Sequence, residues 1–464
     1  MAIGNSALAW LERVASQDGP LYLAIVRALE QATLAGELQP GDRLPPQREL
    51  AQRLGVDLTT ITRAYSVART LGLLEGAVGR GSFVRARTED DEAGLVDLTM
   101  NLPPPPEGLS LGAMLQETVT AILQRADPAV LMAYHPGFGA PGQRRAGAEW
   151  LAPCLGERSP DCLLVSPGAQ AALAAVLGTL CRPGDTVVAE PLTYPGFTGV
   201  AAQLGLRVVA CASDEQGVIP EALEAVCARE RPAAVYLVPT MQNPTAVTMP
   251  PKRRREAARV VSRAGAWLVE DDPYSRLMEA PPAAVSSFHP GRSVYIGTLA
   301  KTLSPGLRIA YIACPSADDA ARFAEALRAI ALMPAPLMAA VASTWIREGR
   351  AEKLLAAVRA EARARRALAA RILPAAAGPP ESLHVWLPLP PGRLGDRSPE
   401  ALRLAAQRRG LALVTHEAFA TTPDAPAGMR LSLGGPGRRL VLEGALRNLA
   451  ELLATSPPAS GWVA

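Results

Sequence analysis

Lysine is scarce in this sequence: only Lys252, Lys301 and Lys353 stand among the 47 basic residues of the 464-residue chain, and the rest are arginine. Cysteine and histidine are also few, at six and four residues, and neither type shows the close spacing of a metal-ligand set. The N-terminus has no basic stretch followed by an apolar segment, as a secretory signal would have. These absences argue against a metal site and favour a reducing, cytoplasmic setting.

The sequence also lacks an uninterrupted apolar run that would read as a membrane span. The best candidate, residues 329–346, contains 18 uncharged residues, but Pro334 and Pro336 interrupt it. A proline inside a helix removes a backbone hydrogen bond and clashes with the preceding turn. We therefore expect a helix, a turn and a second helix here rather than a membrane segment.

An acidic stretch divides the chain. In "RARTEDDEAGLVD" four acidic residues stand together without apolar periodicity, which is typical of a solvated linker. The sequence thus predicts a small N-terminal domain over residues 1–85, a linker over 86–97 and a large domain over 98–464. The net charge of +3 does not by itself demand a polyanionic partner.

The N-terminal domain has the pattern of three short helices followed by a hairpin. "PLYLAIVRALEQATLAGEL" carries apolar residues at helical spacing, and Pro46 is placed to start a second helix that Gly55 ends. Asp57 can cap a third helix, whose inner stripe would be Ile61, Ala64, Tyr65 and Ala68. "GLLEGAVGRGSFVRA" then reads as a strand, a glycine-rich turn and a strand. Two helices joined at a glycine, with polar residues opening the second, suit helix-turn-helix recognition of DNA.

The phrases "GDRLPPQRELAQRLGV" and "GRGSFV" resemble the winged-helix domain of the GntR family of bacterial repressors. A winged helix used only for protein contacts is the alternative. Leu58 stands where the family often has arginine, so base preference does not carry over. The domain is only weakly basic, so we expect a dimer to present two copies to the DNA. The resemblance implies that these residues face DNA: Arg48, Thr59, Thr60, Arg63 and Arg80.

The large domain alternates short apolar runs with helical stretches, which is typical of an α/β sheet with helices on its faces. The expected strands are "CLLVS", "DTVVAE", "AAVYLVP", "AWLVED" and "SVYIGT". Sites in such folds lie at the carboxyl ends of strands. Lys301 in "GTLAKTLSP" follows one strand, and Asp271 and Asp272 in "WLVEDDPYSRL" follow another. An amine can lose its proton and attack a carbonyl, which a guanidinium cannot.

These parts suit pyridoxal phosphate, which needs a lysine for a Schiff base, a carboxylate for its ring nitrogen, an anion site and a planar neighbour. Residues 98–455 resemble fold-type I pyridoxal-phosphate enzymes of the class I aminotransferase kind. With the winged helix they resemble the MocR subfamily of GntR regulators, in which an aminotransferase-like domain serves as effector sensor. The phrase "LTMNLPPPP" also resembles the start of that domain in one branch of the subfamily.

The resemblance assigns Lys301 as the Schiff-base lysine and Asp271, rather than Asp272, as the partner of the ring nitrogen. Arg430 in "GMRLSLGG" would grip the effector's α-carboxylate. The other cofactor-binding residues that it implies are Tyr134 from a neighbouring subunit, Gly168, Ala169, Gln170, Thr298 and Arg308 around the phosphate, Tyr194 on the ring face, and Asn243 and Tyr274 at the ring's phenolic oxygen.

Two functions from different classes stay open on the sequence. In the first, the chain is a homodimeric transcriptional regulator that senses an amino acid or amine by forming an external aldimine in place of the Lys301 linkage. In the second, it is an aminotransferase with an accessory DNA-binding domain. The complete winged helix favours the regulator, while Lys301, Asp271 and Arg430 leave residual aminotransferase activity open. The effector, the operator and the sign of regulation cannot be read from the sequence.

Overall fold

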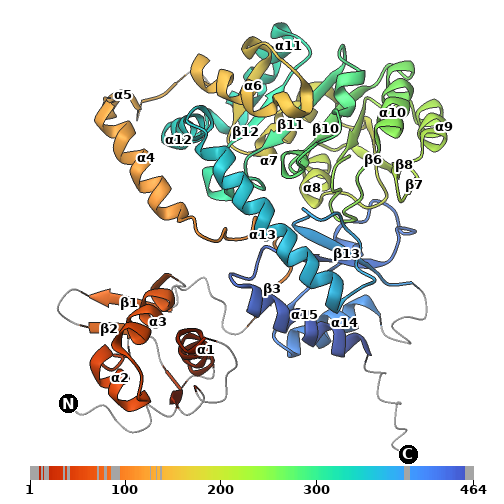
Figure 1. Cartoon of the computed structure of the whole chain (residues 1–464). Helices are drawn as coiled ribbons and strands as arrows, with labels where there is room; N and C mark the ends of the chain where they lie inside the picture. The colour runs from red at the N-terminus through yellow and green to blue at the C-terminus, as the bar shows by residue number, and fades with distance from the viewer. Residues whose placement is uncertain are drawn as a thin grey trace, which may run out of the picture. The chain divides into compact units, whose positions relative to one another are not determined.

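The computed structural model divides the chain into two compact units, residues 1–94 and 95–464 (Figure 1). The residues that the structure describes are 10–11, 14, 20–34, 37–38, 42–70, 73–77, 81–84, 95–125, 127–131, 133–135, 138–390 and 398–454. Arg80 and most of the predicted linker lie outside them.

The smaller unit is a three-helix cluster with a two-stranded sheet. Its elements are α1 (Leu21–Leu34), α2 (Gln47–Leu54), α3 (Leu58–Thr70), β1 (Leu74–Ala77) and β2 (Gly81–Val84). The predicted stripe on α3 is confirmed, since Ile61, Ala64, Tyr65 and Ala68 are buried in the core of this unit. The antiparallel pair β1–β2 is the predicted hairpin, with Leu74 opposite Val84 and Ala77 opposite Gly81.

Local capping fixes the junction between α2 and α3. Pro46 is the N-cap of α2, one residue before the helix, and Gly55 ends α2 with φ 63°, a left-handed conformation that glycine adopts without strain. The Asp57 Oδ1 atom then accepts the backbone N–H of Thr59 at 2.7 Å. The two helices therefore meet across a short turn, as a helix-turn-helix requires.

The larger unit is built on a seven-stranded sheet in the order β4-β12-β11-β10-β9-β5-β6. The strands are β4 (Leu163–Ser166), β5 (Thr186–Ala189), β6 (Arg207–Ala210), β9 (Ala234–Leu237), β10 (Trp267–Asp271), β11 (Ser293–Thr298) and β12 (Ala310–Ala313). Only β12 runs against its neighbours, so the carboxyl ends of the other six strands share one edge. The five predicted strands are confirmed within two residues at either end. The antiparallel β12 was not predicted.

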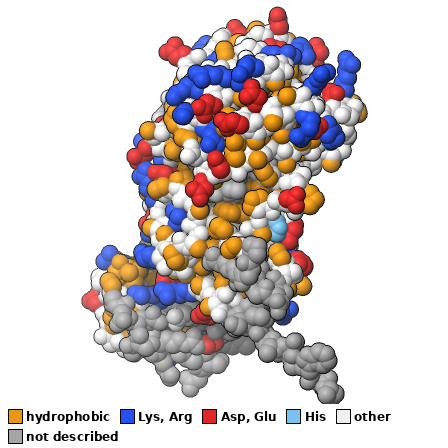
Figure 2. Space-filling view, turned by 90° about the vertical axis from the view of Figure 1, so that its right-hand side faces the viewer, with side chains coloured by type: hydrophobic (Ala, Val, Ile, Leu, Met, Phe, Trp, Pro, Cys, Tyr) orange, Lys and Arg blue, Asp and Glu red, His pale blue; other side chains and the backbone are white. Residues whose placement is uncertain are grey.

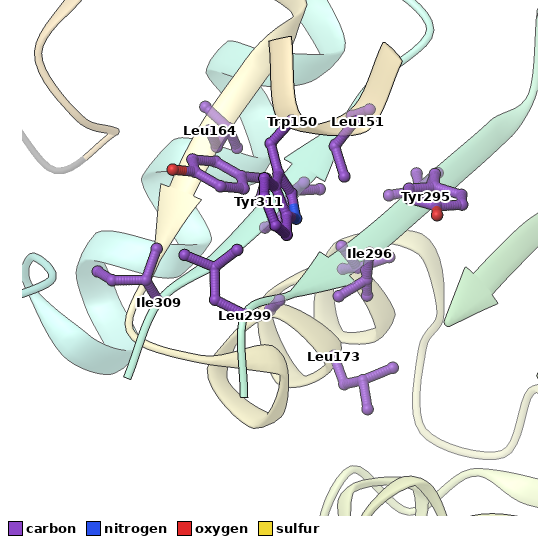
Figure 3. Packing of buried hydrophobic residues seen from close by; sticks show 14 of the residues in the cluster. Trp150, Leu151, Leu164, Leu173, Tyr295, Ile296, Leu299, Ile309 and Tyr311 are labelled. Carbon is purple, nitrogen blue, oxygen red and sulfur yellow. The ribbon is translucent and has the colours of Figure 1, made fainter. Parts of the chain in front are cut away.

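Helices cover both faces of this sheet. The α-helices between residues 111 and 372 are α4 (Leu111–Arg125), α5 (Pro128–Leu131), α6 (Pro141–Leu155), α7 (Ala169–Leu180), α8 (Pro195–Gln203), α9 (Pro220–Glu230), α10 (Pro251–Arg263), α11 (Ala317–Ala331), α12 (Pro336–Arg347) and α13 (Arg350–Ile372). Of these, α4 and α5 lie away from the sheet, and α4 packs against α12 (Figure 1). Figure 3 shows Trp150 and Leu151 of α6 on one side of the sheet and Leu173 of α7 on the other. A Cβ atom on Gly297 of β11 would lie 2.6 Å from the Leu151 side chain, so this glycine lets α6 pack closely.

The predicted break between residues 329 and 346 is confirmed, because α11 ends at Ala331 and α12 begins at Pro336. In the part of the chain that the structure describes, no helix combines the length and apolar character of a membrane span. On the face seen in Figure 2, acidic and basic side chains of the larger unit are intermixed rather than gathered by sign.

A C-terminal subdomain completes the larger unit. It contains β13 (His384–Pro388), β14 (Leu411–Ala412), β15 (Val414–Thr415), β16 (Gly428–Ser432), α14 (Pro399–Arg408) and α15 (Arg439–Ala454). A separate hairpin of the larger unit, β7 (Ser213–Asp214) and β8 (Gly217–Val218), does not belong to this subdomain. Strand β3 (Val96–Asp97), formed by the last two residues assigned to the linker, pairs in parallel with β14. The chain thus enters the larger unit through this subdomain.

Candidate functional site

A cavity of about 500 Å³ lies at the shared carboxyl edge of the sheet. It is lined by residues that follow β5, β9, β10 and β11, by the start of α7, by residues 99–102 and by the C-terminal subdomain. The predicted cofactor and effector residues that it brings together are Ala169, Gln170, Tyr194, Asn243, Asp271, Tyr274, Thr298, Lys301, Arg308 and Arg430. Gly168 adjoins them as the N-cap of α7. Tyr134 is 82% exposed and does not line the cavity.

Lys301 stands three residues beyond the end of β11, and its amine faces the cavity. The Nζ atom donates a hydrogen bond to the backbone carbonyl of Asn101 at 2.5 Å. The pKa of Lys301 is lowered from 10.5 to about 8, mainly by burial; the cations of Arg430 and Arg308 act in the same direction, and Asp271 opposes them. At pH 7 roughly a tenth of this amine is therefore neutral, and so nucleophilic.

Asp271 is the last residue of β10 and is buried. Its Oδ2 atom accepts a hydrogen bond from the Tyr236 hydroxyl at 2.8 Å, and the Tyr236 ring is held by stacking on Phe197 at 3.9 Å. Burial raises the pKa of Asp271 to about 7, although the bond from Tyr236 acts to lower it. Its Oδ1 atom is buried and has no hydrogen-bond partner among the described residues. A buried carboxylate oxygen in this state is an acceptor for a donor that a ligand brings.

Asp272 is the next residue and is also buried, but its oxygens are occupied by hydrogen bonds from the protein itself. It accepts the backbone N–H of Ser275 at 2.8 Å, the backbone N–H of Tyr274 at 3.2 Å and the Tyr295 hydroxyl at 3.0 Å. These bonds hold the turn after β10. Among the two carboxylates, Asp271 alone has an unpartnered oxygen and lines the cavity.

An anion cradle lies at the start of α7. Gly168 has φ 95°, and a Cβ atom there would lie 2.7 Å from Nη2 of Arg308, so glycine is needed for the close approach. The first backbone N–H groups of α7 point out of the helix, where they attract anions. The Arg308 guanidinium has no side-chain hydrogen bond within the described ranges, and its charge is available to a phosphate.

Gln170 and Tyr194 form one wall of the cavity. The Gln170 side chain donates to the carbonyl of Gly196 at 2.8 Å and accepts from the Tyr194 hydroxyl at 3.2 Å. The ring of Tyr194 is thereby fixed beside the cavity. A Cβ atom at Gly196 would lie 2.4 Å from that ring, so the backbone of α8 also packs against it.

A buried chain of hydrogen bonds that the sequence does not predict connects four distant segments. His384 Nε2 lies 3.0 Å from the carbonyl of Gln242, which places its proton there, and burial lowers the pKa of His384 to about 3, so the ring is neutral. His384 Nδ1 must then accept from Asn101 Nδ2, at 2.9 Å, and the same amide nitrogen donates to the Tyr274 hydroxyl at 2.9 Å. Tyr274 keeps its own hydroxyl proton for a partner in the cavity.

Arg430 on β16 brings a cation to the cavity from the C-terminal subdomain. Its Nη1 atom donates to Oδ1 of Asn243 at 2.7 Å, and its Nη2 atom donates to the backbone carbonyl of Thr99. Its carbon centre lies 5.0 Å from the ring centroid of Phe419, while its buried Nε atom has no partner among the described residues. A ligand carboxylate would find a guanidinium here that is held in place from two sides.

The donor set fits pyridoxal phosphate. The unpartnered Asp271 oxygen can accept the N–H of a pyridinium ring, the α7 terminus and Arg308 can hold a phosphate, and Lys301 supplies an amine of lowered pKa. Each of these three features lies in the same cavity or at its edge.

The predicted DNA-facing residues of the smaller unit lie on α2 and α3. Arg48, Thr59 and Arg63 are exposed, and Thr60 is half-buried. The Arg63 guanidinium lies 4.1 Å from the ring centroid of Tyr22, and the Thr59 hydroxyl donates to Asp57 at 2.6 Å. Leu58, at the first position of α3, is 39% exposed. The predicted wing residue Arg80 lies outside the described residues.

Comparisons with known proteins match both units. Residues 21–84 match the family model of bacterial regulatory proteins of the gntR family, and residues 94–423 match that of aminotransferase class I and II. The chain is 31% identical to the HTH-type transcriptional regulator YdeF of Bacillus subtilis over 97% of this chain and 98% of that protein. It is 29% identical to the probable rhizopine catabolism regulatory protein MocR of Rhizobium meliloti, over 72% of this chain and 73% of that one.

Among solved structures, the chain resembles LysN, the α-aminoadipate aminotransferase of Thermus thermophilus, in complex with N-(5'-phosphopyridoxyl)-L-leucine. The TM-score is 0.70 at 26% identity, covering 84% of this chain and 98% of LysN.

Proposed function

The chain belongs to the MocR-type regulators of the GntR family, which makes it a DNA-binding regulator that uses pyridoxal phosphate, and we propose that it senses an amino acid or amine through that cofactor. The observation that carries the proposal is the meeting of Lys301, Asp271 and Arg430 at one cavity. An amine, a carboxylate and a guanidinium are what a cofactor linkage, a ring nitrogen and an effector carboxylate respectively require.

The side chains divide the work of binding. When bound, pyridoxal phosphate supplies an aldehyde that condenses reversibly with primary amines. Asp271 holds a proton on the ring nitrogen, and Tyr274 donates its hydroxyl proton to the ring oxygen. Gly168, the start of α7 and Arg308 hold the phosphate. Lys301 accepts and releases the proton that amine exchange requires, because its pKa is about 8.

Arg430 provides the selection between effector classes. An amino acid brings a carboxylate to the guanidinium, whereas a simple amine brings none. A bidentate charge-assisted pair contributes about 1.5–3 kcal/mol, which is roughly a tenfold to hundredfold gain in affinity. We therefore propose amino acids as the preferred class.

The proposed assembly is a homodimer in the cytoplasm. Tyr134 is 82% exposed and outside the cavity of its own chain, as expected of a residue that reaches a neighbouring subunit's phosphate. A dimer would also present two winged helices to DNA half-sites. Cross-linking and sedimentation of the purified protein test the dimer directly.

The second candidate function is an aminotransferase with an accessory DNA-binding unit. The lowered pKa of Lys301 favours it, because a base that works near neutral pH is what proton transfer during amino-group exchange needs. The two candidates differ in output: one changes DNA affinity, and the other converts amino donors and 2-oxo acids at ordinary enzyme rates.

A titration separates them. The holoprotein is titrated with single amino acids and with the amines formed by their decarboxylation, and the cofactor absorption and the affinity for its own promoter DNA are recorded. We expect that at least one amino acid changes both the cofactor absorption and the affinity for promoter DNA.

Arg430→Ala should weaken the response to that amino acid at least about tenfold and leave the response to the amine within about twofold. Arg403→Ala, an exposed arginine paired with Glu400, is the control. A protein that fails to retard promoter DNA while turning over amino donors would be an enzyme.

A further inference from the structure

The segment 97–102, "DLTMNL", joins the predicted linker to the cavity. Thr99, Met100, Asn101 and Leu102 line the cavity, while Asp97 belongs to β3. Backbone hydrogen bonds fix the segment to the C-terminal subdomain, from Leu98 N–H to the Ala412 carbonyl at 3.0 Å and from Ser432 N–H to the Leu98 carbonyl at 2.9 Å. The residues that the DNA-binding unit is attached through are therefore also walls of the ligand site.

The segment is folded tightly. The Asp97 Oδ1 atom accepts the backbone N–H of Thr99 at 2.6 Å and that of Met100 at 3.3 Å, which closes a local turn. Gly434 and Gly435 pack against it, since a Cβ atom at Gly434 would lie 1.7 Å from the Leu102 carbonyl oxygen and one at Gly435 would lie 2.5 Å from that of Asp97. The turn therefore cannot move toward Gly434 and Gly435 without a steric clash.

Two carbonyl groups of the segment accept hydrogen bonds from two of the three basic side chains that line the cavity. The Thr99 carbonyl accepts from Nη2 of Arg430, and the Asn101 carbonyl accepts from Nζ of Lys301 at 2.5 Å. These donors are the same groups that the proposed function assigns to the effector carboxylate and to the cofactor. A ligand that recruits either donor competes with the segment for it.

We propose that effector binding changes which of these two donors is bonded to the segment 97–102. The resulting change in the conformation of the segment is then transmitted to the linker that precedes it. The inference rests on the proposed function. With cofactor bound and no effector, the Lys301 nitrogen would be held by the cofactor's aldehyde carbon and could not donate to Asn101, while Arg430 would donate to the Thr99 carbonyl. The amine of an amino acid would take the place of the lysine nitrogen at that carbon, and the displaced Lys301 amine would take up the proton that the effector amine gives up, so no co-reactant would be needed. Lys301 then donates to Asn101, and Arg430 turns from Thr99 to the carboxylate.

Amino acids and simple amines should affect the two donors differently. An amino acid moves both donors, because it carries an amine and a carboxylate. The matching amine moves only Lys301 and leaves Arg430 on the Thr99 carbonyl. Two effectors with the same cofactor chemistry thus place the segment in two different states.

Hydrogen exchange on the full-length holoprotein tests this directly. The probe is the amino acid with the largest spectral shift, and the matched ligand is its decarboxylated amine. We expect faster exchange of the backbone amides of residues 95–102 with the amino acid, because the turn that Asp97 closes loses the bond from Arg430 to the Thr99 carbonyl, and a smaller change with the amine. Unchanged exchange in this segment, while the amino acid still alters the spectrum and the DNA affinity, would overturn the inference.

A variant separates the inference from the proposed function. Asp97 lies outside the cavity lining, so Asp97→Ala should keep the spectral titration within about threefold of the wild type. It should also reduce the effector's effect on DNA affinity from a coupling of about tenfold to near none. Asp97→Asn retains the oxygen that closes the turn and should restore the coupling. Asn448→Ala on α15 is the matched surface control.

Wild-type coupling in Asp97→Ala would refute the inference. A wild-type protein without any spectral or DNA response would instead refute the proposed function, and if Asp97→Ala does not fold, the exchange measurement decides.

Discussion

Arginine is used under opposite conditions in the two units of the chain. Arg63 on α3 is exposed, with a single described contact to the Tyr22 ring, whereas Arg430 at the cavity is buried and donates to Asn243 and Thr99. An exposed arginine acts on a phosphate through a screened charge, but a buried one acts through fixed geometry in a low dielectric. Substitutions at the cavity should therefore change function by large factors, and those on the predicted DNA-facing surface by small ones.

Lys301→Ala is expected to have the largest effect. It removes the amine that donates to the Asn101 carbonyl, and neither Lys252 nor Lys353 lines the cavity. The visible absorption of the lysine-bound cofactor should disappear completely in the purified protein. Lys353→Ala on α13 is the matched control and should leave the spectrum unchanged. An unaltered spectrum in Lys301→Ala would remove the cofactor assignment.

The strand ends of the site could be predicted because burial leaves a strong local signal. Runs such as "AWLVED" and "SVYIGT" are apolar over a strand's length, and both strands are buried throughout or nearly so. A polar residue directly after such a run must lie at the sheet edge, which placed Asp271 and Lys301 together. The antiparallel direction of β12 leaves no comparable signal, because strand direction depends on pairing between distant segments.

Asn101 and His384 show what sequence patterns miss. The Asn101 amide bonds to residues 173 and 283 positions away, and neither contact has a local periodicity. His384 is one of the four histidines that lack the spacing of a metal-ligand set, and no other pattern in the sequence marks it. The sole hint was the phrase "LTMNLPPPP", which marked the domain start without assigning a role to any residue in it.

Asp271→Asn should have the next largest effect, and it tests why neighbouring carboxylates differ. It removes a buried charge whose Oδ1 atom awaits a donor, so the affinity for pyridoxal phosphate should fall about 10–100-fold, or about 1.5–3 kcal/mol. Asp272→Asn disturbs a turn instead and should lower the free energy of unfolding by about 1–3 kcal/mol with a smaller loss of cofactor affinity. Equilibrium dialysis and denaturant titration measure the two quantities. A reversed pattern would assign the ring nitrogen to Asp272.

The pH dependence of cofactor binding should show how strongly burial and the Arg430 charge lower the pKa of Lys301. The neutral amine is the attacking form, so the rate at which cofactor-free protein binds pyridoxal phosphate rises as pH passes the Lys301 pKa of about 8. We expect a rise of roughly tenfold between pH 7 and pH 9. Arg430→Ala should move the midpoint upward, because the guanidinium lowers the Lys301 pKa. Stopped-flow absorption gives the profile, and a midpoint above pH 10 would mean that the amine is not buried as described.

Arg63→Ala should give the smallest effect. The side chain is exposed and contributes one positive charge to the α3 surface, so its loss should weaken promoter binding only severalfold and reduce the salt dependence of log affinity by about one. The cofactor spectrum should not change. Arg53→Ala is the matched control, because this exposed arginine of α2 is already paired with Glu49 and should alter DNA affinity less. Fluorescence anisotropy at several salt concentrations measures both. Equal losses in the two variants would show that α3 presents a diffuse charge rather than a specific phosphate contact, and the contrast between the exposed and the buried arginines would then rest on net charge alone.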